Sequence, residues 1–266
     1  MICVPKISLW ETVATIQIAQ ALSEKHFYCD ELDQYQLLLS ANLNRVGAGE
    51  GLVLNYDRAY RTVEDTQDLI VACSCGGALQ CQKCFATGQV IQRGPSYVDV
   101  LAACSGLSAE FESPKFMDLR NNGWSGQDGI VVCPFAVKPG LELPVAAWRA
   151  IVRHLRTYGY PVYLMGDRGQ WQDDCAYLEK EILSEQPIVI KLSYLANAKL
   201  IVGVPNEWTW AAAGFNTKMV YFYPERMPTR RWFSFASANF GRIVYDPDQL
   251  QIAVLLSGLR QLIAQL

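Results

Sequence analysis

The sequence lacks the signatures of several large functional classes. It contains only two histidines, His26 and His154, which excludes a histidine-rich metal centre. Neither G-x-G-x-x-G nor G-x-x-x-x-G-K-[ST] occurs, so a dinucleotide dehydrogenase or a P-loop nucleotidase has no local support. Positive charge is not in excess, because 23 Lys and Arg stand against 26 Asp and Glu and the formal net charge is −3. This mild acidity disfavours duplex DNA as a partner.

Long apolar runs are also missing. No run reaches the ~18 residues that a membrane span requires, and residues 1–11 lack the order of charge and hydrophobicity that marks a signal peptide. Nine cysteines in a chain of this kind favour free thiols in a reducing compartment. We therefore expect a cytoplasmic protein with a globular core. Its 266 residues suffice for two lobes.

After residue 129 the pattern alternates regularly between buried strands and helices. Strands are predicted at 130–135, 161–166, 188–190, 200–204 and 218–223. Helices are predicted at 146–159, 172–183, 193–198 and 209–215. Such alternation predicts a parallel sheet with right-handed crossovers. The chain closes with a helical pattern at 246–266, in which Asp246 can act as the N-cap. Its apolar face is predicted to consist of Leu250, Val254, Leu255, Leu259, Leu262 and Ile263.

The first half of the chain is less regular. Strands are predicted at 2–7, 51–56 and 68–74, the last as a buried strand, and residues 27–31 are a short strand or a turn. Helices are predicted at 8–24, 33–43 and 96–107, with a stop at Gly106. Residues 120–129 are rich in Asn and Gly and predict a linker. We expect an α/β lobe at 1–122, a second at 128–245, and a C-terminal helix at 246–266 that packs on the lobes. A cleft between two lobes is a favoured ligand site.

The most informative stretch is 199–224. It predicts a buried strand, a polar turn, a short helix and a second buried strand. A strand that runs into a helix N-terminus directs several backbone N–H groups at one point, where a diphosphate can bind. Ligands of parallel sheets bind at the carboxyl ends of the strands. The stretch therefore indicates a nucleotide-type ligand.

Residues 203–220 resemble the motif G-N-D-S-G-P-M-H-L-A-A-A-L-G-T-P-T-V of glycosyltransferase family 9, the ADP-heptose:lipopolysaccharide heptosyltransferases, without a gap. The matching positions are Gly203, Ala212, Ala213, Thr217 and Val220. Pro205 and Trp210 stand where the family has Asp and His.

Two further stretches carry the resemblance. Residues 7–22 are similar to the family's opening motif G-x-G-D-V-L-L-A-T-P-A-L-R-A-L. Glu11 aligns with the Asp of that motif, while Ser8 and Trp10 replace its glycines. Residues 131–167 are similar in layout to the family's strand, Pro-Gly-rich loop, helix and second strand. Pro134, a displaced Lys138, Pro144 and Gly166 survive there.

The resemblance implies the GT-B fold, with two Rossmann-like lobes whose parallel sheets face a central cleft. It implies a glycosyltransferase that moves a sugar from an ADP-, UDP- or GDP-linked donor to a hydroxyl acceptor, with inversion and without a metal. Such a reaction needs a base for the acceptor proton and groups that stabilise the leaving diphosphate. Glu11 is the expected base; the alternative is a carboxylate that only favours the dipole of the first helical turn.

The expected donor-binding residues are Lys138, Gly166, Asp167, Asn206, Glu207, Trp208 and Thr209. Each has a plainer alternative. Lys138 can be an exposed loop lysine, and Gly166 with Asp167 can form an ordinary turn. Asn206 or Thr209 can simply cap the following helix, with Trp208 packed against the linker.

The cysteines Cys73, Cys75, Cys81 and Cys84 lie close together in the sequence. Four thiolates complete a tetrahedral zinc shell, and C-x-x-C is a common ligand spacing. A zinc ion here would be structural, since no position is left open for catalysis. The alternative is a thiol-rich strand end that binds no metal.

Three functions stay open at this point. The first is a glycosyltransferase whose acceptor is a glycan, a protein or a modified nucleobase. The second is a catalytically altered GT-B relative that serves as a nucleotide-binding or scaffold module, which the changes at Ser8, Trp10, Pro205 and Trp210 suggest. The third is another nucleotide-sugar enzyme on the same fold, such as an epimerase. Fold analogy alone does not decide among them.

Overall fold

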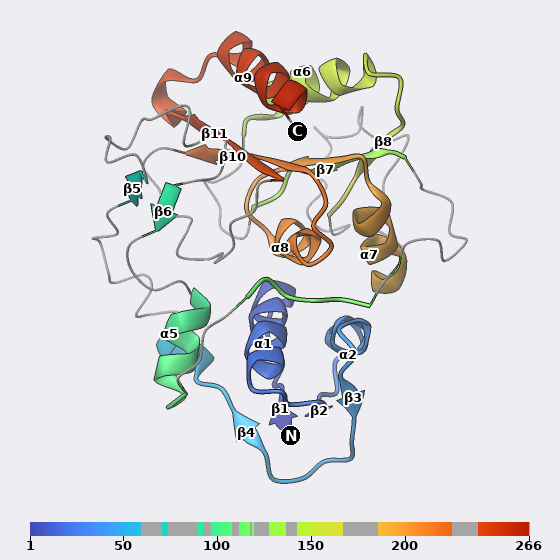
Figure 1. Ribbon diagram of the computed structural model, residues 1–266, viewed down its shortest axis with the longest axis vertical. Coiled ribbons are helices and arrows are strands. Elements are labelled where there is room, and N and C mark those ends of the chain that lie inside the picture. Colours follow the sequence, from blue (N-terminus) through green and yellow to red (C-terminus); the bar gives the residue numbers. More distant parts are fainter. Residues whose placement is uncertain are drawn as a thin grey trace.

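Two parallel sheets, each covered by helices, dominate the computed structural model of this chain (Figure 1). The structure describes residues 1–59, 71–73, 90–92, 97–107, 112–117, 119, 128–136, 143–166, 186–224 and 239–265. The linker predicted at 120–129 is described only at its last two residues, and the helix predicted at 172–183 lies outside the described residues.

The first lobe has a four-stranded sheet in the order β3-β2-β1-β4. Its strands are β1 (Ile2–Cys3), β2 (His26–Tyr28), β3 (Asn44–Arg45) and β4 (Leu52–Val53). Its helices are α1 (Leu9–Ala21), α2 (Leu32–Ser40) and α5 (Tyr97–Cys104). All three helices were predicted, and Gly106 follows α5 at a φ of 73°, which explains the predicted stop.

The strand predicted at 68–74 belongs to a different sheet. It is present as β5 (Val71–Cys73), which pairs antiparallel with β6 (Val90–Gln92) in a separate two-stranded sheet. The sequence pattern did not predict β6.

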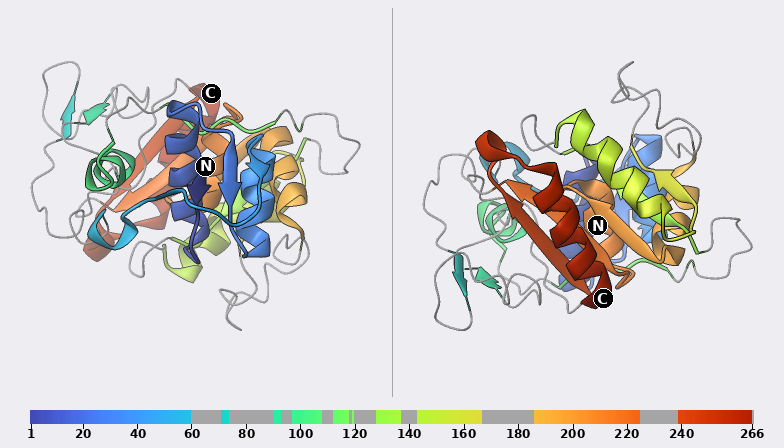
Figure 2. Two further views of the ribbon diagram at one scale, coloured as in Figure 1. Left: turned by 90° about the horizontal axis from the view of Figure 1, so that it is seen from below. Right: turned by 90° about the horizontal axis from the view of Figure 1, so that it is seen from above.

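The second lobe has a five-stranded parallel sheet in the order β11-β10-β9-β7-β8. Its strands are β7 (Ile130–Cys133), β8 (Val162–Leu164), β9 (Leu200–Gly203), β10 (Met219–Pro224) and β11 (Phe240–Tyr245). Its helices are α6 (Val145–Arg156), α7 (Ile188–Asn197), α8 (Glu207–Ala213) and α9 (Ile252–Gln265). Helices α6 and α9 cover the outer face, and α7 and α8 cover the face toward the first lobe (Figures 1 and 2).

The structure of the second lobe differs from the sequence prediction at three places: residues 188–190, strand β11 and the start of the C-terminal helix. The strand predicted at 188–190 is the first turn of α7, because Ile188, Leu192 and Leu195 are buried at a helical spacing that outweighs the β-branched run. Strand β11 was missed. Asp246 caps a short 3-10 turn (Pro247–Gln249) by accepting a hydrogen bond from the Asp248 N–H at 3.0 Å. Helix α9 starts only at Ile252.

The apolar face predicted for 246–266 is correct in its centre. Leu255, Leu259 and Leu262 are buried against the outer face of the second sheet, whereas Val254 is 61% exposed. The C-terminal helix thus packs on β10, β11 and α6 of the second lobe.

Helix α1 is buried on every side. All its residues from Thr12 to Ala19 are buried, including the polar Thr12, Thr15 and Gln17. It packs against α2 and α5 of its own lobe and against α8 of the other lobe, while α2 packs against α7. Two layers of helices therefore lie between the two sheets (Figure 1). One continuous hydrophobic core runs from the first sheet through these helices to the second sheet.

A crossing segment, residues 112–117 and 119, ties the lobes together (Figure 1). Gln17 Nε2 donates to the Glu112 carbonyl at 2.5 Å, and Gln20 Nε2 donates to the Lys115 carbonyl at 2.6 Å. On the other side, Phe116 stacks on Phe215 with ring centroids 5.3 Å apart. The crossing segment thus contacts both lobes through specific side chains.

Gly214, at the end of α8, is tightly packed under this segment. A Cβ at Gly214 would overlap the Pro114 carbonyl oxygen and lie 2.9 Å from Phe116 Cδ2. We expect Gly214→Ala to lower the free energy of unfolding by about 1–3 kcal/mol, because the added methyl must displace backbone. Urea unfolding of the variant measures the loss. Gly47→Ala is the control, since a Cβ there meets nothing within 4 Å. Equal stability of the two variants would contradict tight packing of the crossing segment.

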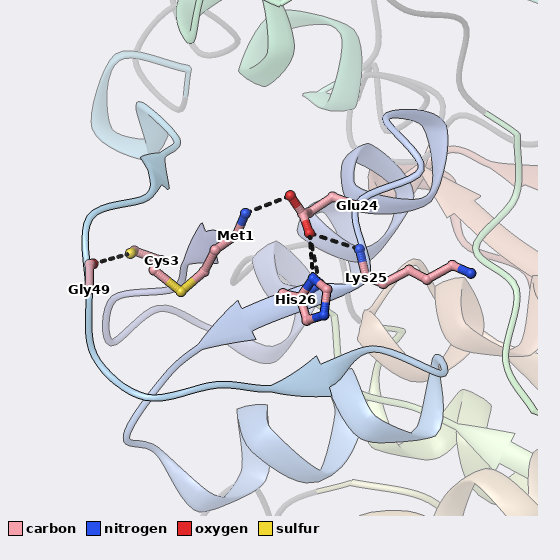
Figure 3. Close-up of polar contacts among 6 residues, drawn as sticks. All are labelled: Met1, Cys3, Glu24, Lys25, His26 and Gly49. Carbon is pink, nitrogen blue, oxygen red and sulfur yellow. Dashed lines mark hydrogen bonds and ion pairs between the residues drawn. The ribbon is translucent and has the colours of Figure 1, made fainter.

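Glu24 joins the start of the chain to the turn before β2 (Figure 3). Its Oε2 accepts from the Met1 amino group at 2.5 Å, and its Oε1 accepts from the N–H groups of Lys25 and His26, both at 2.9 Å. The hydrogen bond from the amino group is the main cause that lowers the pKa of Glu24 to about 2, followed by the His26 N–H. An unfolded glutamate has a pKa near ~4.3. The carboxylate therefore stabilises the fold at neutral pH, and this contribution is lost as pH falls from about 4 to about 2.

We expect Glu24→Gln to lower the free energy of unfolding by about 0.2–1 kcal/mol at pH 7, the range for ion pairs near the surface. The difference between parent and variant should shrink toward pH 2, where Glu24 becomes protonated in the folded parent as well. Urea unfolding across this pH range measures it, with the exposed Glu50→Gln as control. A difference that stays constant with pH would show that the carboxylate charge is not responsible.

Candidate functional site

The loop between β1 and α1 is held from the side by α2. Gln34, which is 2% exposed, donates through Nε2 to the carbonyls of Pro5 at 3.1 Å and Ile7 at 3.0 Å. This loop leaves the carboxyl end of β1, which is where parallel sheets present ligand-binding residues. A buried amide thus fixes the loop that carries the family-like motif.

Glu11 lies at the N3 position of α1 and caps the helix. Its Oε2 accepts from the Ser8 N–H at 3.0 Å and from the Ser8 hydroxyl at 2.6 Å. This is the reciprocal arm of a capping box. Oε1 accepts one longer hydrogen bond, from the Tyr97 hydroxyl at 3.4 Å. Glu11 is half-buried, and Oε1 is the less engaged of its two oxygens.

Two buried tyrosines surround the first turn of α1. Tyr97 comes from the start of α5, and Tyr56 follows β4. Thr15 Oγ1 donates to the Glu11 carbonyl at 2.9 Å, so the Tyr56 hydroxyl, 2.9 Å from Thr15 Oγ1, must donate to it. Burial raises the pKa of both phenols, and the Glu11 charge raises each further. Both are therefore neutral hydrogen-bond donors at physiological pH.

Trp10 occupies the place of a glycine in the family-like motif. It is 8% exposed, and its ring packs edge-on against Tyr97 with centroids 4.6 Å apart. Sequence reasoning missed Tyr56 and Tyr97. The sequence signal for them was slight: Tyr56 ends a predicted strand, and Tyr97 is the second residue of a predicted helix.

In the second lobe, Asn206 and Thr209 cap α8 reciprocally. Asn206 Oδ1 accepts from the Thr209 N–H at 2.9 Å, and Thr209 Oγ1 accepts from the Asn206 N–H at 3.0 Å. Asn206 Nδ2 also donates to the Phe135 carbonyl at 2.6 Å, which ties the turn to the end of β7. The capping role considered for these residues is confirmed. Both side chains are buried and used within the fold.

Glu207 and Trp208 occupy the first turn of α8. Trp208 is 2% exposed, and the Lys191 Nζ of α7 lies 4.9 Å from its ring centroid. Glu207 is half-buried, and its charge adds to burial in raising the pKa of the Cys133 thiol at the end of β7. A contact of either side chain with a donor stays a prediction.

Gly203, a position shared with the family motif, has a packing role. A Cβ there would lie 2.8 Å from the Cys133 carbonyl oxygen and 3.0 Å from Thr209 Cγ2. Only glycine therefore lets α8 lie this close to the sheet.

Tyr221 and Arg242 form a row with Cys133 and Gly203 across four neighbouring strands. Arg242 is the register neighbour of Tyr221 on β11. Burial raises the pKa of the Tyr221 phenol, and the charge of Arg242 opposes this increase. Arg242 is only half-buried. Sequence reasoning missed this cation because β11 was not predicted.

Some predicted residues are not placed. Lys138, Asp167, Cys75, Cys81 and Cys84 lie outside the described residues, and only the backbone of Cys73 is described, at the end of β5. Gly166 is buried just after β8.

Within the described ranges, no group of three or more His, Cys, Asp or Glu is arranged to hold a metal ion. The same ranges hold no helix long and apolar enough to cross a membrane.

No family model matches the sequence, and no curated protein matches it. Solved structures do match over the whole chain. A glycosyl transferase family 9 protein from Veillonella parvula DSM 2008 has a TM-score of 0.60 at 10% identity, covering 100% of this chain and 97% of that chain. Escherichia coli heptosyltransferase WaaC with ADP has a TM-score of 0.59 at 14% identity, covering 99% of each chain.

A third match has the same character. Escherichia coli ADP-heptose lps heptosyltransferase II has a TM-score of 0.57 at 13% identity, covering 99% of this chain and 98% of that chain. At such identities the likeness concerns the fold. It confirms the predicted α/β class and the GT-B arrangement, and the chain is similar in structure to glycosyltransferases of family 9.

Proposed function

We propose that this protein is a glycosyltransferase, which moves a sugar from a nucleotide-sugar donor to a hydroxyl acceptor. The observation that carries the proposal is the match of both lobes, over nearly the full length of each chain, to proteins described as glycosyltransferases. One of those structures contains ADP, which supports a nucleotide-linked donor here. Fold alone does not establish an activity, so the chemistry must come from the residues of the site.

In this proposal, Glu11 is the base. Oε2 is fixed by the two donors of Ser8, which leaves Oε1 to accept the proton of the acceptor hydroxyl. The acceptor oxygen forms a bond to the anomeric carbon as the bond from that carbon to the diphosphate oxygen breaks. The nucleoside diphosphate leaves with the electron pair. A single displacement of this kind inverts the anomeric configuration.

The donor side of the proposed site is the second lobe. Backbone N–H groups of the turn before α8, together with Lys138, would bind the diphosphate, and Gly166 and Asp167 would lie near the nucleotide. These groups supply the charge stabilisation for which other enzymes use a metal ion. We propose a metal-independent reaction in the cytoplasm, with a glycan, a protein or a modified nucleobase as acceptor.

A catalytically altered relative that binds nucleotides without sugar transfer is the second candidate. Specific observations favour it: Glu11 serves as a helix cap, Trp10 fills the place of a glycine, and the side chains of Asn206 and Thr209 are used within the fold.

One experiment separates these candidates. Thermal unfolding with ADP-, UDP- and GDP-sugars identifies a donor by an increase in Tm, and product analysis with that donor distinguishes transfer from isomerisation. Glu11→Gln should lower kcat by about 10²–10⁴-fold, the usual contribution of a general base, with little change in KM. Asp33→Asn, an exposed acid in the first turn of α2, is the matched control and should keep the parent rate.

The outcomes decide between the candidates. Binding without turnover in the parent protein favours the altered relative. A folded parent protein whose Tm shifts with none of the nucleotide-sugars contradicts both, and a Glu11→Gln variant with the parent kcat removes Glu11 from the base role.

We propose in addition that Cys73, Cys75, Cys81 and Cys84 hold a structural zinc ion. About one zinc per chain is then expected in the purified protein, and it should be lost in Cys81→Ser. Elemental analysis measures the ratio, with Cys104→Ser as control. A zinc-free parent protein would support the thiol-rich alternative.

A further inference from the structure

Two sets of hydrogen bonds hold the first turn of α1. One acts on the backbone carbonyl of Glu11, and the other acts on its side-chain carboxylate. At the backbone, Tyr56 donates to Thr15, and Thr15 donates to the Glu11 carbonyl. At the side chain, Ser8 binds Oε2 through two donors, and Tyr97 donates to Oε1. Of the donors to the Glu11 side chain, Ser8 is three residues away, whereas Tyr97 is 86 residues away.

Tyr97 is well suited to be a fixed donor. It is 0% exposed and lies at the start of α5, which packs against α1. The Trp10 ring meets the Tyr97 ring edge-on at 4.6 Å between centroids and limits its rotation. A phenol confined in this way points its hydroxyl in one direction and cannot easily follow a carboxylate that moves.

The orientation of the Glu11 carboxylate depends on both of its oxygens. The donors of Ser8 both bind Oε2 and fix the position of that oxygen. Neither of these donors contacts Oε1, so the orientation of Oε1 depends on a contact of its own. The Tyr97 hydroxyl provides that contact because it approaches Oε1 from another element.

We propose that Tyr97 is a positioning residue, which holds Oε1 of Glu11 in the orientation that accepts the proton of the sugar acceptor. This inference rests on the proposed transferase function. Tyr97 itself neither takes nor gives a proton in the reaction, since the proton passes from the acceptor hydroxyl to Glu11. A misdirected base slows the chemical step without weakening donor binding.

Kinetics of four variants test the proposal: Tyr97→Phe, Glu11→Gln, the double variant, and Tyr28→Phe. Tyr28 is the matched control, because its hydroxyl also donates to a carboxylate, Asp30 Oδ1 at 2.9 Å. We expect Tyr97→Phe to lower kcat about tenfold with KM unchanged, as for the loss of one hydrogen bond to a charged group. Tyr28→Phe should keep the parent kcat. In the Glu11→Gln background, Tyr97→Phe should lower the residual rate no further.

A second readout does not depend on turnover. Thermal unfolding of the parent and the same variants forms a double-mutant cycle. The Tm losses of Tyr97→Phe and Glu11→Gln should not add, since each variant lacks the hydrogen bond between the Tyr97 hydroxyl and a charged carboxylate. If the parent protein transfers no sugar, the proposed function fails. Non-additive Tm losses would then still support the contact between the Tyr97 hydroxyl and the Glu11 carboxylate. Additive Tm losses overturn the proposal, and so does a Tyr97→Phe variant with the parent kcat in an active enzyme.

Discussion

The burial of α1 on every side is the constraint on which the rest of this structure depends. The helix packs under α8, so the core of the first lobe continues without interruption into the core of the second. Each large apolar side chain that is buried in this layer contributes roughly 1.5–3 kcal/mol. The crossing segment reinforces the same contact through Gln17 and Gln20. The position of Glu11, at the start of α1, is therefore set by the packing of both lobes.

The two turns that carry the family-like motifs are held by side chains. In the first lobe, Gln34 binds the loop carbonyls and Trp10 packs where the family has glycine. In the second, Asn206 and Thr209 cap each other, and Asn206 also donates to the Phe135 carbonyl just after β7. Glycines let a backbone approach a ligand closely, whereas bulky and buried side chains fix the loop and limit that approach.

Helices and strands could be predicted from the sequence where their buried residues form a clear pattern of apolar positions. The parallel strands of the second lobe are buried on both faces and read as apolar runs, whereas the run at Ile188 was misread because β-branched residues favour strands when context is ignored. Glu11 was identified through the resemblance, since an acid in a first turn is common. Tyr97 could not be found, because its partner lies 86 residues away and no local pattern marks such a contact. Arg242 became visible only when β11 placed it beside Tyr221.

The central claim is that a nucleotide-sugar binds against the second lobe with its reactive carbon directed at Glu11. A crystal structure of the protein with a nucleotide-sugar tests this claim most directly. We predict density for the diphosphate at the turn before α8, and the anomeric carbon on the side of Oε1 of Glu11, with room for an acceptor hydroxyl between them. A nucleotide bound elsewhere on the molecule, or a sugar on the far side of the diphosphate from Glu11, would contradict it.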